Sequence, residues 1–415
     1  MIKFKLSDFL SYVAVFLVVL VLIGKVYIVE LFGRNTICSY ILLLSSFIIF
    51  ILMIKKKTIN RKRLVFPILL IMMWLPSLYN NAYIADGKLE FFLNYTFAIL
   101  FFCLYSLYED KNEKMDFVLK IFVAFALIAS IATWISYLFP KIYLEKMIYI
   151  IPEYSRELVV HMFKYDHAYA GITNHYSRNA FYILLGVLAS IKFLNKNRGV
   201  NIALIIFFLI TLFLVGKRGH LLFLGMALII SYFITNRVSI KVVLRFIMIT
   251  IILSLIVTLA IRYIPGADNI FNRITNYSKD VSTGRFALYD KAIDLYKSNE
   301  NTPIGWGQFS KSTKYYYAAV HNDYLQIFVE TGIIGLLLII GGNLIILFKS
   351  IFLVRKEKSL LAYIILSFNI FFLLYSLTGL PHYDSEVYLA YFIFNTFLFI
   401  NLTNNTNLKK EIEEN

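Results

Sequence analysis

The chain has 415 residues, of which 60% are hydrophobic and 16% are charged, and its mean hydropathy is +0.71. Soluble domains contain roughly 45–50% apolar and about 25% charged residues, so this composition excludes a soluble globular protein. The formal charge of +16 would indicate a nucleic-acid partner in a soluble protein, but in a membrane protein it first indicates basic cytoplasmic loops.

The two cysteines, Cys38 and Cys103, each lie inside an apolar run. They offer neither a disulfide framework nor a paired-cysteine metal site. We expect the first apolar run to remain in the protein as a membrane span, because no small-residue cleavage site precedes Gly24.

Apolar runs long enough for membrane helices recur along the whole chain. A helix needs about 20 apolar residues to cross roughly 30 Å of hydrocarbon. The runs that approach this length predict twelve spans, at residues 9–24, 36–54, 64–79, 90–107, 117–139, 177–194, 200–216, 221–235, 242–263, 323–348, 359–378 and 386–402. We therefore expect an all-α polytopic membrane protein, with residues 1–415 forming a single integral membrane domain.

The distribution of basic residues predicts the orientation of these spans. With the N-terminus inside, the inner segments hold twenty-one Lys and Arg residues, whereas the short outer loops hold only Lys25, Arg34, Lys88, Lys217 and Arg218. Because Lys and Arg favour short cytoplasmic loops, both termini are expected in the cytoplasm.

Two longer connections lie on the outer face in this topology, at residues 140–176 and 264–320. In the second, apolar residues within 286–296 follow a helical spacing, and the sequence PIGWG at 303–307 ends this pattern. We therefore expect a long, partly helical outer loop before the tenth span.

The short outer turn VGKRGH at 215–220 places Lys217 and Arg218 where the charge distribution predicts few cations. Cations at a membrane-buried turn are costly unless they face an anionic partner. Arginine donates two parallel hydrogen bonds to phosphate, and flanking glycines let a ligand approach the backbone. The turn is a candidate pyrophosphate site; the alternative is that the spans are miscounted and this is one more cytoplasmic turn.

Two further arginines are candidates for phosphate binding. Arg285 follows the sequence STG at the expected start of the loop helix, where free N–H groups and the helix dipole favour an anion. A solvated arginine on a capped surface helix is the alternative for this residue. Arg178 lies at the outer end of the sixth span, where an interfacial anchor is the alternative.

The tenth span opens with HNDYLQIFVETGIIG at 321–335. His321 can act as a general base that accepts a proton from a sugar hydroxyl, although a histidine that only caps the helix gives the same pattern. Asn322 beside it is taken as a supporting residue. Glu330 lies about 13 Å deeper along the helix. It is either a functional carboxylate with a cation partner or half of a structural ion pair with an arginine such as Arg218.

A metal or other cofactor is not expected. One group of potential ligands in the first outer loop matches no metal-site spacing, and it consists of His161, Asp166, His167 and His175.

Taken in order, these motifs resemble the signature region of the O-antigen ligase and O-antigen polymerase superfamily, over residues 174–340. The motifs are the GKRGH turn, the TGR sequence at 283–285 with PIGWG, and the HN pair followed by the ETGIIG run. The resemblance implies a GT-C-like polytopic glycosyltransferase. Such an enzyme moves a glycan from a polyprenyl pyrophosphate carrier to an acceptor on the outer face of the bacterial cytoplasmic membrane.

The resemblance also implies roles for individual residues. The family's arginine in its short basic turn falls on Arg218, its loop arginine on Arg285, and its catalytic histidine on His321. The arginines, helped by Lys217 and Arg178, would stabilise the leaving pyrophosphate without a metal. His321 would deprotonate the attacking hydroxyl, with inversion at the anomeric carbon. The sequence departs from the family pattern at Lys217 and at His220, which bears on the geometry of the donor site and on the acceptor.

The expected partners are an undecaprenyl-pyrophosphate-linked glycan donor, membrane lipid, and an acceptor that is either a lipid-linked repeat unit or lipid A core. A chain-length regulator is left open as a further partner, and no nucleic acid is expected. A polymerase of O-antigen or capsular polysaccharide repeat units is favoured over a ligase by the moderate length of the second outer loop and a composition rich in Lys and Asn. A flippase for the same lipid-linked sugar is the alternative of another class, but the repeated halves typical of a transporter are not evident.

Overall fold

The computed structural model describes residues 5–413 apart from 35, 57–60, 86–88, 110–112, 166, most of 237–283 and 313–318. The described residues form helices and turns, and no strand occurs among them. Contacts within the chain divide it into two compact units. Unit 1 comprises Met1–Val118, Ser282–Leu353 and Phe372–Asn415, and unit 2 comprises Leu119–Val281 and Val354–Phe371.

Unit 1 holds the helices near both ends of the chain and those around the HND motif at residues 321–323. Its elements are α1 (Leu6–Phe32), α2 (Thr36–Lys56), η1 (Arg61–Arg63), α3 (Val65–Trp74), η2 (Leu75–Leu78), α4 (Ala82–Ala85), α5 (Leu89–Tyr108), α14 (Arg285–Ser298), α15 (Gln308–Ser312), most of α16 (Asp323–Glu357), and α18 (Ser385–Glu413).

Unit 2 holds the helices around the basic turn. Its elements are most of α6 (Glu113–Leu138), α7 (Pro140–Glu145), η3 (Met147–Ile150), α8 (Glu153–Tyr165), α9 (Tyr176–Lys192), α10 (Arg198–Val215), α11 (Arg218–Thr235) and most of α17 (Leu360–Tyr375).

The helices coincide closely with the predicted apolar runs. Among the described residues, eight helices are long and apolar enough to cross a membrane, namely α1, α2, α5, α6, α10, α11, α16 and the apolar part of α18. The runs 64–79, 177–194 and 359–378 form the shorter helices α3 with η2, α9 and α17. The run 242–263 lies almost entirely outside the described residues, as do 264–283 and 313–318 of the second outer loop. A helical, multi-pass membrane protein is therefore confirmed, and the number twelve stays a prediction.

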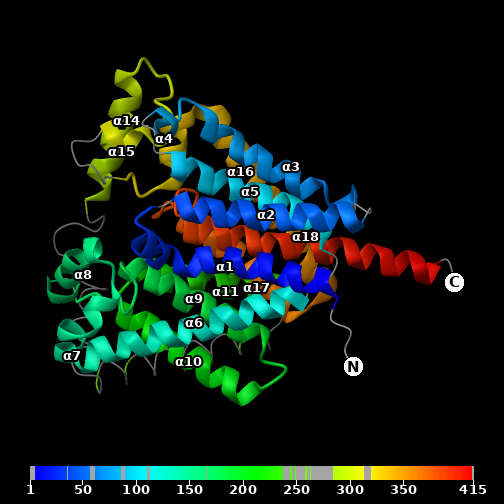
Figure 1. The fold of residues 1–415 in the computed structure, drawn as a ribbon, viewed down its shortest axis with the longest axis horizontal. Coiled ribbons are helices and arrows are strands. Elements are labelled where there is room, and N and C mark those ends of the chain that lie inside the picture. The colour runs from blue at the N-terminus through cyan, green and yellow to red at the C-terminus, as the bar shows by residue number, and fades with distance from the viewer. Residues whose placement is uncertain are drawn as a thin grey trace. The chain divides into compact units, whose positions relative to one another are not determined.

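In unit 1, α2 packs between α1 and α5, and both α3 and α18 also pack against α5 (Figure 1). The buried face of α2 carries the small residues Ser39, Ser45 and Ser46. Small side chains let apolar helices approach closely where lipid offers no hydrophobic driving force. The other face of α2 exposes large apolar side chains, including Phe47 and Ile54, as a lipid-facing surface requires.

One end of unit 1 contains buried charges. Arg63 is only 1% exposed, and its Nε donates to Thr403 Oγ1 (2.7 Å). Its Nη1 donates to the backbone oxygens of Ser106 and Glu109. Lys114, also buried, pairs with the Glu109 carboxylate. Arg63 and Lys114 both count among the basic residues expected on the cytoplasmic side. In the structure, both are buried and stabilise unit 1.

Helix α16 is interrupted at Gly332, whose φ of 73° and ψ of −173° are not helical. Just before the interruption, the backbone oxygens of Val329 and Glu330 accept from the N–H groups of Ile304 (3.1 Å) and Gly305 (2.8 Å). A Cβ atom at Gly332 would lie 2.8 Å from Pro303 Cγ. The ETG and PIGWG motifs therefore form one structure, in which the second motif fills the break made by the first.

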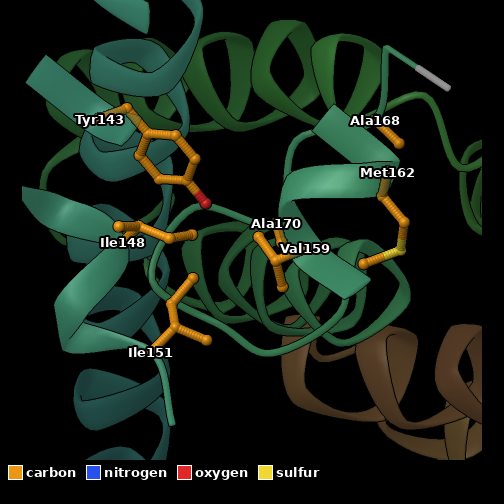
Figure 2. Close-up of a cluster of buried hydrophobic side chains, with 7 residues drawn as sticks. All are labelled: Tyr143, Ile148, Ile151, Val159, Met162, Ala168 and Ala170. Carbon is orange, nitrogen blue, oxygen red and sulfur yellow. The ribbon is translucent and has the colours of Figure 1, made fainter. Parts of the chain in front are cut away.

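In unit 2, the connection 140–176 is folded into α7, η3 and α8. Figure 2 shows apolar side chains from these elements and the following loop pointing toward one another, and they are Tyr143, Ile148, Ile151, Val159, Met162, Ala168 and Ala170. The Tyr143 hydroxyl also donates to the Gly171 oxygen (2.9 Å). This small core fixes the chain that leads to the start of α9.

Candidate active site

A turn of two residues joins α10 to α11 in unit 2. Gly216 ends α10 in the left-handed conformation (φ 74°), and its N–H donates to the Phe213 oxygen (3.0 Å). Glycine at this position avoids the steric cost that a side chain would meet. Lys217 follows in an extended conformation, and Arg218 is the first residue of α11. The basic turn therefore places a half-buried arginine at the N-terminus of an apolar helix.

The start of α9 lies against this turn. The Lys217 ammonium is 5.1 Å from the centre of the ring of Tyr176, which is the first residue of α9. His175 caps α9, because its Nδ1 accepts from the Ser177 N–H (3.1 Å). Arg178 follows in the first turn of α9. The contact between Lys217 and Tyr176 thus brings together two helix N-termini that both carry basic residues.

Arg178 is held in place within this turn, since its Nη1 donates to Asn174 Oδ1 (2.8 Å). Cations at a helix N-terminus are unfavourable by themselves, because the macrodipole already places positive partial charge there. A bound anion makes the arrangement favourable. It accepts hydrogen bonds from the N–H groups of the first turn and offsets the positive charge of the basic side chains. The geometry of Arg178, Lys217 and Arg218 suits a phosphate group.

The side chain of His220 is buried within unit 2. It is 1% exposed, and its ring centre lies 6.4 Å from that of Phe181 and 5.8 Å from that of Phe371. The departure from the family pattern at this position is therefore accommodated among aromatic side chains.

In unit 1, His321 immediately precedes the cap of α16. Its φ is 57°, in the left-handed region that side-chain-bearing residues seldom adopt, and its side chain is exposed. Asn322 provides the cap, because its Oδ1 accepts from the Leu325 N–H (3.0 Å). On the other side, the Val320 N–H donates to Gln326 Oε1 (3.2 Å). The backbone around His321 is thus fixed, and unusual backbone conformations of this kind concentrate at functional sites.

A buried pair that sequence reasoning missed joins α16 to the loop before α18. His382 Nδ1 donates to Asp323 Oδ2, and the Asp323 N–H donates to the Ser376 oxygen (2.8 Å). Asn343 Nδ2 donates to His382 Nε2 (3.4 Å), and Tyr391 donates to Asn343 Oδ1 (2.8 Å). Asp323 and His382 are 0% and 2% exposed. This chain of polar contacts holds the first turn of α16, two residues from His321.

Glu330 is fully buried, and the donors to its carboxylate in the described part of the chain are neutral. The backbone N–H groups of Gly307 (2.7 Å) and Phe309 (3.1 Å) donate to it, as do Gln326 Nε2 (3.3 Å) and the Tyr383 hydroxyl (2.6 Å). Burial and the adjacent carboxylate raise the pKa of Tyr383 well above its usual value, so this hydroxyl remains a donor at physiological pH. Within the described part of unit 1, dipoles thus surround the Glu330 side chain.

Arg285 is the first residue of α14 and follows Gly284, which has a φ of 82°. The helix packs through Ala292 on a small core that includes Val320 and Val329. Figure 1 shows α14 beside α15 and α4 at one end of unit 1. The core therefore connects the helix that begins at Arg285 with the segment that carries His321.

The predicted site residues divide between the two units. Unit 2 groups Arg178, Lys217 and Arg218 at its converging helix ends. Unit 1 holds Arg285 at the start of α14, and it holds His321, Asn322 and Glu330 along α16. In the described part of the chain, no group of His, Cys, Asp and Glu side chains could hold a metal ion, and Asp166 lies outside that part.

Residues 202–340 match the family model described as O-Antigen ligase. The matched range contains Lys217, Arg218, Arg285, His321 and Glu330, together with Asn322, whereas Arg178 precedes it. No curated protein matches the chain. The family match confirms the resemblance to the O-antigen ligase and O-antigen polymerase superfamily.

Proposed function

We propose that this protein, which carries an O-antigen ligase domain at residues 202–340, transfers a glycan from undecaprenyl pyrophosphate to a sugar hydroxyl. The reaction takes place on the outer face of the cytoplasmic membrane, with both termini in the cytoplasm. The acceptor is the next lipid-linked repeat unit, so that the enzyme polymerises O-antigen or capsular polysaccharide. The fold is that of a GT-C-like membrane glycosyltransferase.

The observation that carries this proposal is the pair of basic helix N-termini in unit 2. Lys217 packs on Tyr176, which places Lys217 and Arg218 beside the first turn of α9 with Arg178. A diphosphate presents enough acceptor oxygens and negative charge for two helix ends and three cations. A single carboxylate offers fewer acceptor oxygens and less negative charge, and a neutral sugar offers no negative charge.

The transfer step requires stabilisation of the leaving group. As the acceptor oxygen attacks the anomeric carbon, the bond from that carbon to the pyrophosphate oxygen breaks, and undecaprenyl pyrophosphate leaves with an additional negative charge. In this proposal Arg218, Arg285, Lys217 and Arg178 stabilise that charge by electrostatic catalysis. Attack from the opposite side inverts the anomeric configuration, and the chain's own cations serve in place of a metal.

His321 accepts the proton of the attacking hydroxyl. Its side chain is exposed, while Asn322 and the neighbouring turn fix its backbone. A base positioned in this way contributes about 10²- to 10⁴-fold in rate. Asp323 and His382 act as positioning residues, because they hold the first turn of the same helix.

A ligase reaction, which attaches finished glycan to lipid A core, is the second candidate, favoured by the description of the matched family. Deletion of the gene separates the two reactions. Loss of a polymerase leaves products with a single repeat unit, whereas loss of a ligase leaves long chains on the lipid carrier. A flippase is tested with purified protein in detergent: an enzyme forms glycosidic product from lipid-linked donor and acceptor without a membrane to cross.

A further inference from the structure

Gln326 is a buried residue of α16 that lies one helical turn before Glu330. Residues that are four apart on a helix face the same side, so the two side chains are neighbours. Gln326 is 4% exposed, and its Nε2 donates to Glu330 Oε1 (3.3 Å). The Gln326 amide is therefore one of the neutral groups around the Glu330 carboxylate.

The other atom of the same amide contacts the segment that precedes the helix. Gln326 Oε1 accepts from the Val320 N–H (3.2 Å), and Val320 immediately precedes His321. Reversal of the amide would place its nitrogen against an N–H donor and its oxygen against a carboxylate, so these partners fix its orientation. Gln326 therefore links the Glu330 carboxylate to the backbone beside His321.

The Glu330 end of this link is held by segments outside α16. The N–H groups of Gly307 and Phe309, in the second outer loop, donate to the carboxylate at 2.7 and 3.1 Å. The Tyr383 hydroxyl, in the loop before α18, donates to it at 2.6 Å. Hydrogen bonds in a buried network of this kind reinforce one another. The carboxylate is consequently a fixed acceptor for Gln326.

The Val320 end of the link is held as well. The Val320 side chain is buried in the core that also contains Ala292 of α14 and Val329 of α16. His321 follows with a φ of 57°, which a residue with a side chain seldom adopts unless its surroundings impose it. The Gln326 side chain and the Asn322 cap constrain the backbone on the two sides of His321.

We propose that Gln326 is a positioning residue for the base His321, and that Glu330 acts through it. The fixed position of Glu330 determines that of the Gln326 amide, and the amide in turn determines where the backbone enters His321. The role of His321 as the base rests on the proposed function. The link gives Glu330 a part in the site through neutral hydrogen-bond partners.

Gln326→Met tests the link, because methionine has nearly the same length and lacks both hydrogen-bonding atoms. The variant should lower kcat about tenfold with little change in the KM for lipid-linked donor, since a misplaced base slows the chemical step. Gln308→Met is the matched control. It changes the other glutamine of the chain, which lies in α15 and donates to the Asn80 oxygen (3.4 Å), and kcat should be unchanged. Equal losses of kcat in the two variants overturn the proposal.

Gln326→Glu gives a readout that general loosening of the helix does not predict, and it preserves the shape of the side chain if Gln326→Met does not fold. The new carboxylate keeps an acceptor for the Val320 N–H, but it repels Glu330 and cannot donate to it. A proton shared between the two carboxylates restores the donor. The ratio of the variant's kcat to the wild-type kcat should therefore rise as the pH falls. A ratio that does not change with pH overturns the proposal.

The ratio separates this effect from the other titratable groups near Glu330, which are Tyr383, Tyr83, and Asp323 with its partner His382. Burial raises the pKa of Tyr83 to about 12 and that of Tyr383 well above its usual value, so both phenols keep their protons in the test. The titration of His321 and His382 is common to both proteins and cancels in the ratio.

Hydrogen exchange of the purified full-length protein in detergent tests the link without any reaction. Amides of residues 320–325 should exchange faster in Gln326→Met than in the wild type, and they should not change in Gln308→Met. Unchanged exchange in Gln326→Met overturns the proposal. If exchange is faster but the wild-type protein forms no glycosidic product, the transferase function fails and the link between Glu330 and Val320 stands.

Discussion

Arg63 and Glu330 are buried ionisable residues that form hydrogen bonds with several neutral groups of unit 1. Glu330 accepts from two backbone N–H groups, an amide and a phenol, and Arg63 donates to a hydroxyl and two backbone oxygens. Removal of such a side chain leaves several buried partners unsatisfied, which costs more than the net contribution of the contacts themselves. Both residues therefore hold separate segments of unit 1 together.

Arg63→Ala should reduce the free energy of unfolding by about 3 kcal/mol, because Thr403 and the oxygens of Ser106 and Glu109 lose their donor. The measurement is the apparent Tm of the purified protein in detergent. Arg61→Ala removes an exposed arginine from the same short helix and serves as the control. Equal Tm values for the two variants would show that Arg63 contributes only charge.

At the scale of elements, the interruption of α16 explains why PIGWG and ETG occur together. Gly332 interrupts the helix, and the N–H groups of Ile304 and Gly305 donate to the carbonyls of Val329 and Glu330 just before the break. The Glu330 side chain then accepts from Gly307 and Phe309, which extends the same contact. The two motifs build a joint between the second outer loop and the start of the tenth predicted span.

Gly332→Ala should destabilise the protein by about 1–3 kcal/mol, since alanine is strained at a φ of 73° and its Cβ would meet Pro303. The control is Gly341→Ala in the same helix, where a Cβ meets nothing within 4 Å. That change should be neutral or slightly stabilising, because alanine favours a helix. Thermal unfolding of both variants tests the difference, and a Gly332→Ala protein as stable as Gly341→Ala would rule out the joint.

The converging N-termini of α9 and α11 give a second prediction at this scale. Arg218→Ala should lower the rate of glycan transfer about a hundredfold. Removal of one preorganised group that stabilises a developing charge has an effect of this size. Arg218→Lys should retain an intermediate rate, because lysine keeps the charge but not the paired hydrogen bonds. Arg198→Ala is the control, since Arg198 is also the first residue of a helix but is exposed. Equal losses for Arg218→Ala and Arg198→Ala would contradict a specific anion site.

The contact between His382 and Asp323 predicts an effect on turnover and not on donor binding. His382→Ala should lower kcat about tenfold with little change in the KM for donor, because a loosened first turn of α16 misplaces the base. His382→Asn, whose amide can replace the Nδ1–H donor, should recover part of that loss. Steady-state kinetics over a range of donor concentrations separates the two constants. A rise in KM alone would assign His382 to substrate binding.

At the scale of the whole molecule, hydropathy predicts the positions of the described helices well, because span length and apolar composition are local properties. It does not predict that 140–176 folds around Tyr143 and Met162, since that core depends on contacts between separate segments. The pairing of Asp323 with His382, 59 residues apart, escapes a reading of motifs for the same reason. The sequence identifies Glu330 as a carboxyl group within a predicted membrane span. It does not predict the N–H groups of Gly307 and Phe309 that donate to it, because they belong to a separate segment.

The candidate site was predicted in its residue types more than in its geometry. The basic turn and the HND motif were identified from the sequence, and the alternative that His321 caps α16 is removed by the position of Asn322. The approach of α9 to the turn was not predicted, because it depends on how Lys217 packs on Tyr176. Motif order thus indicates chemistry, while tertiary packing decides which groups act together.

The central claim, that His321 is the base of a glycan transfer, is tested most directly by product formation with purified protein and lipid-linked donor and acceptor. His321→Ala should lose at least about a hundredfold in rate. It should still bind the lipid-linked donor, since the basic helix ends are intact. His161→Ala, which changes an exposed histidine of α8, should transfer normally. Transfer by His321→Ala at the wild-type rate, with protein folded and donor bound, would contradict the account.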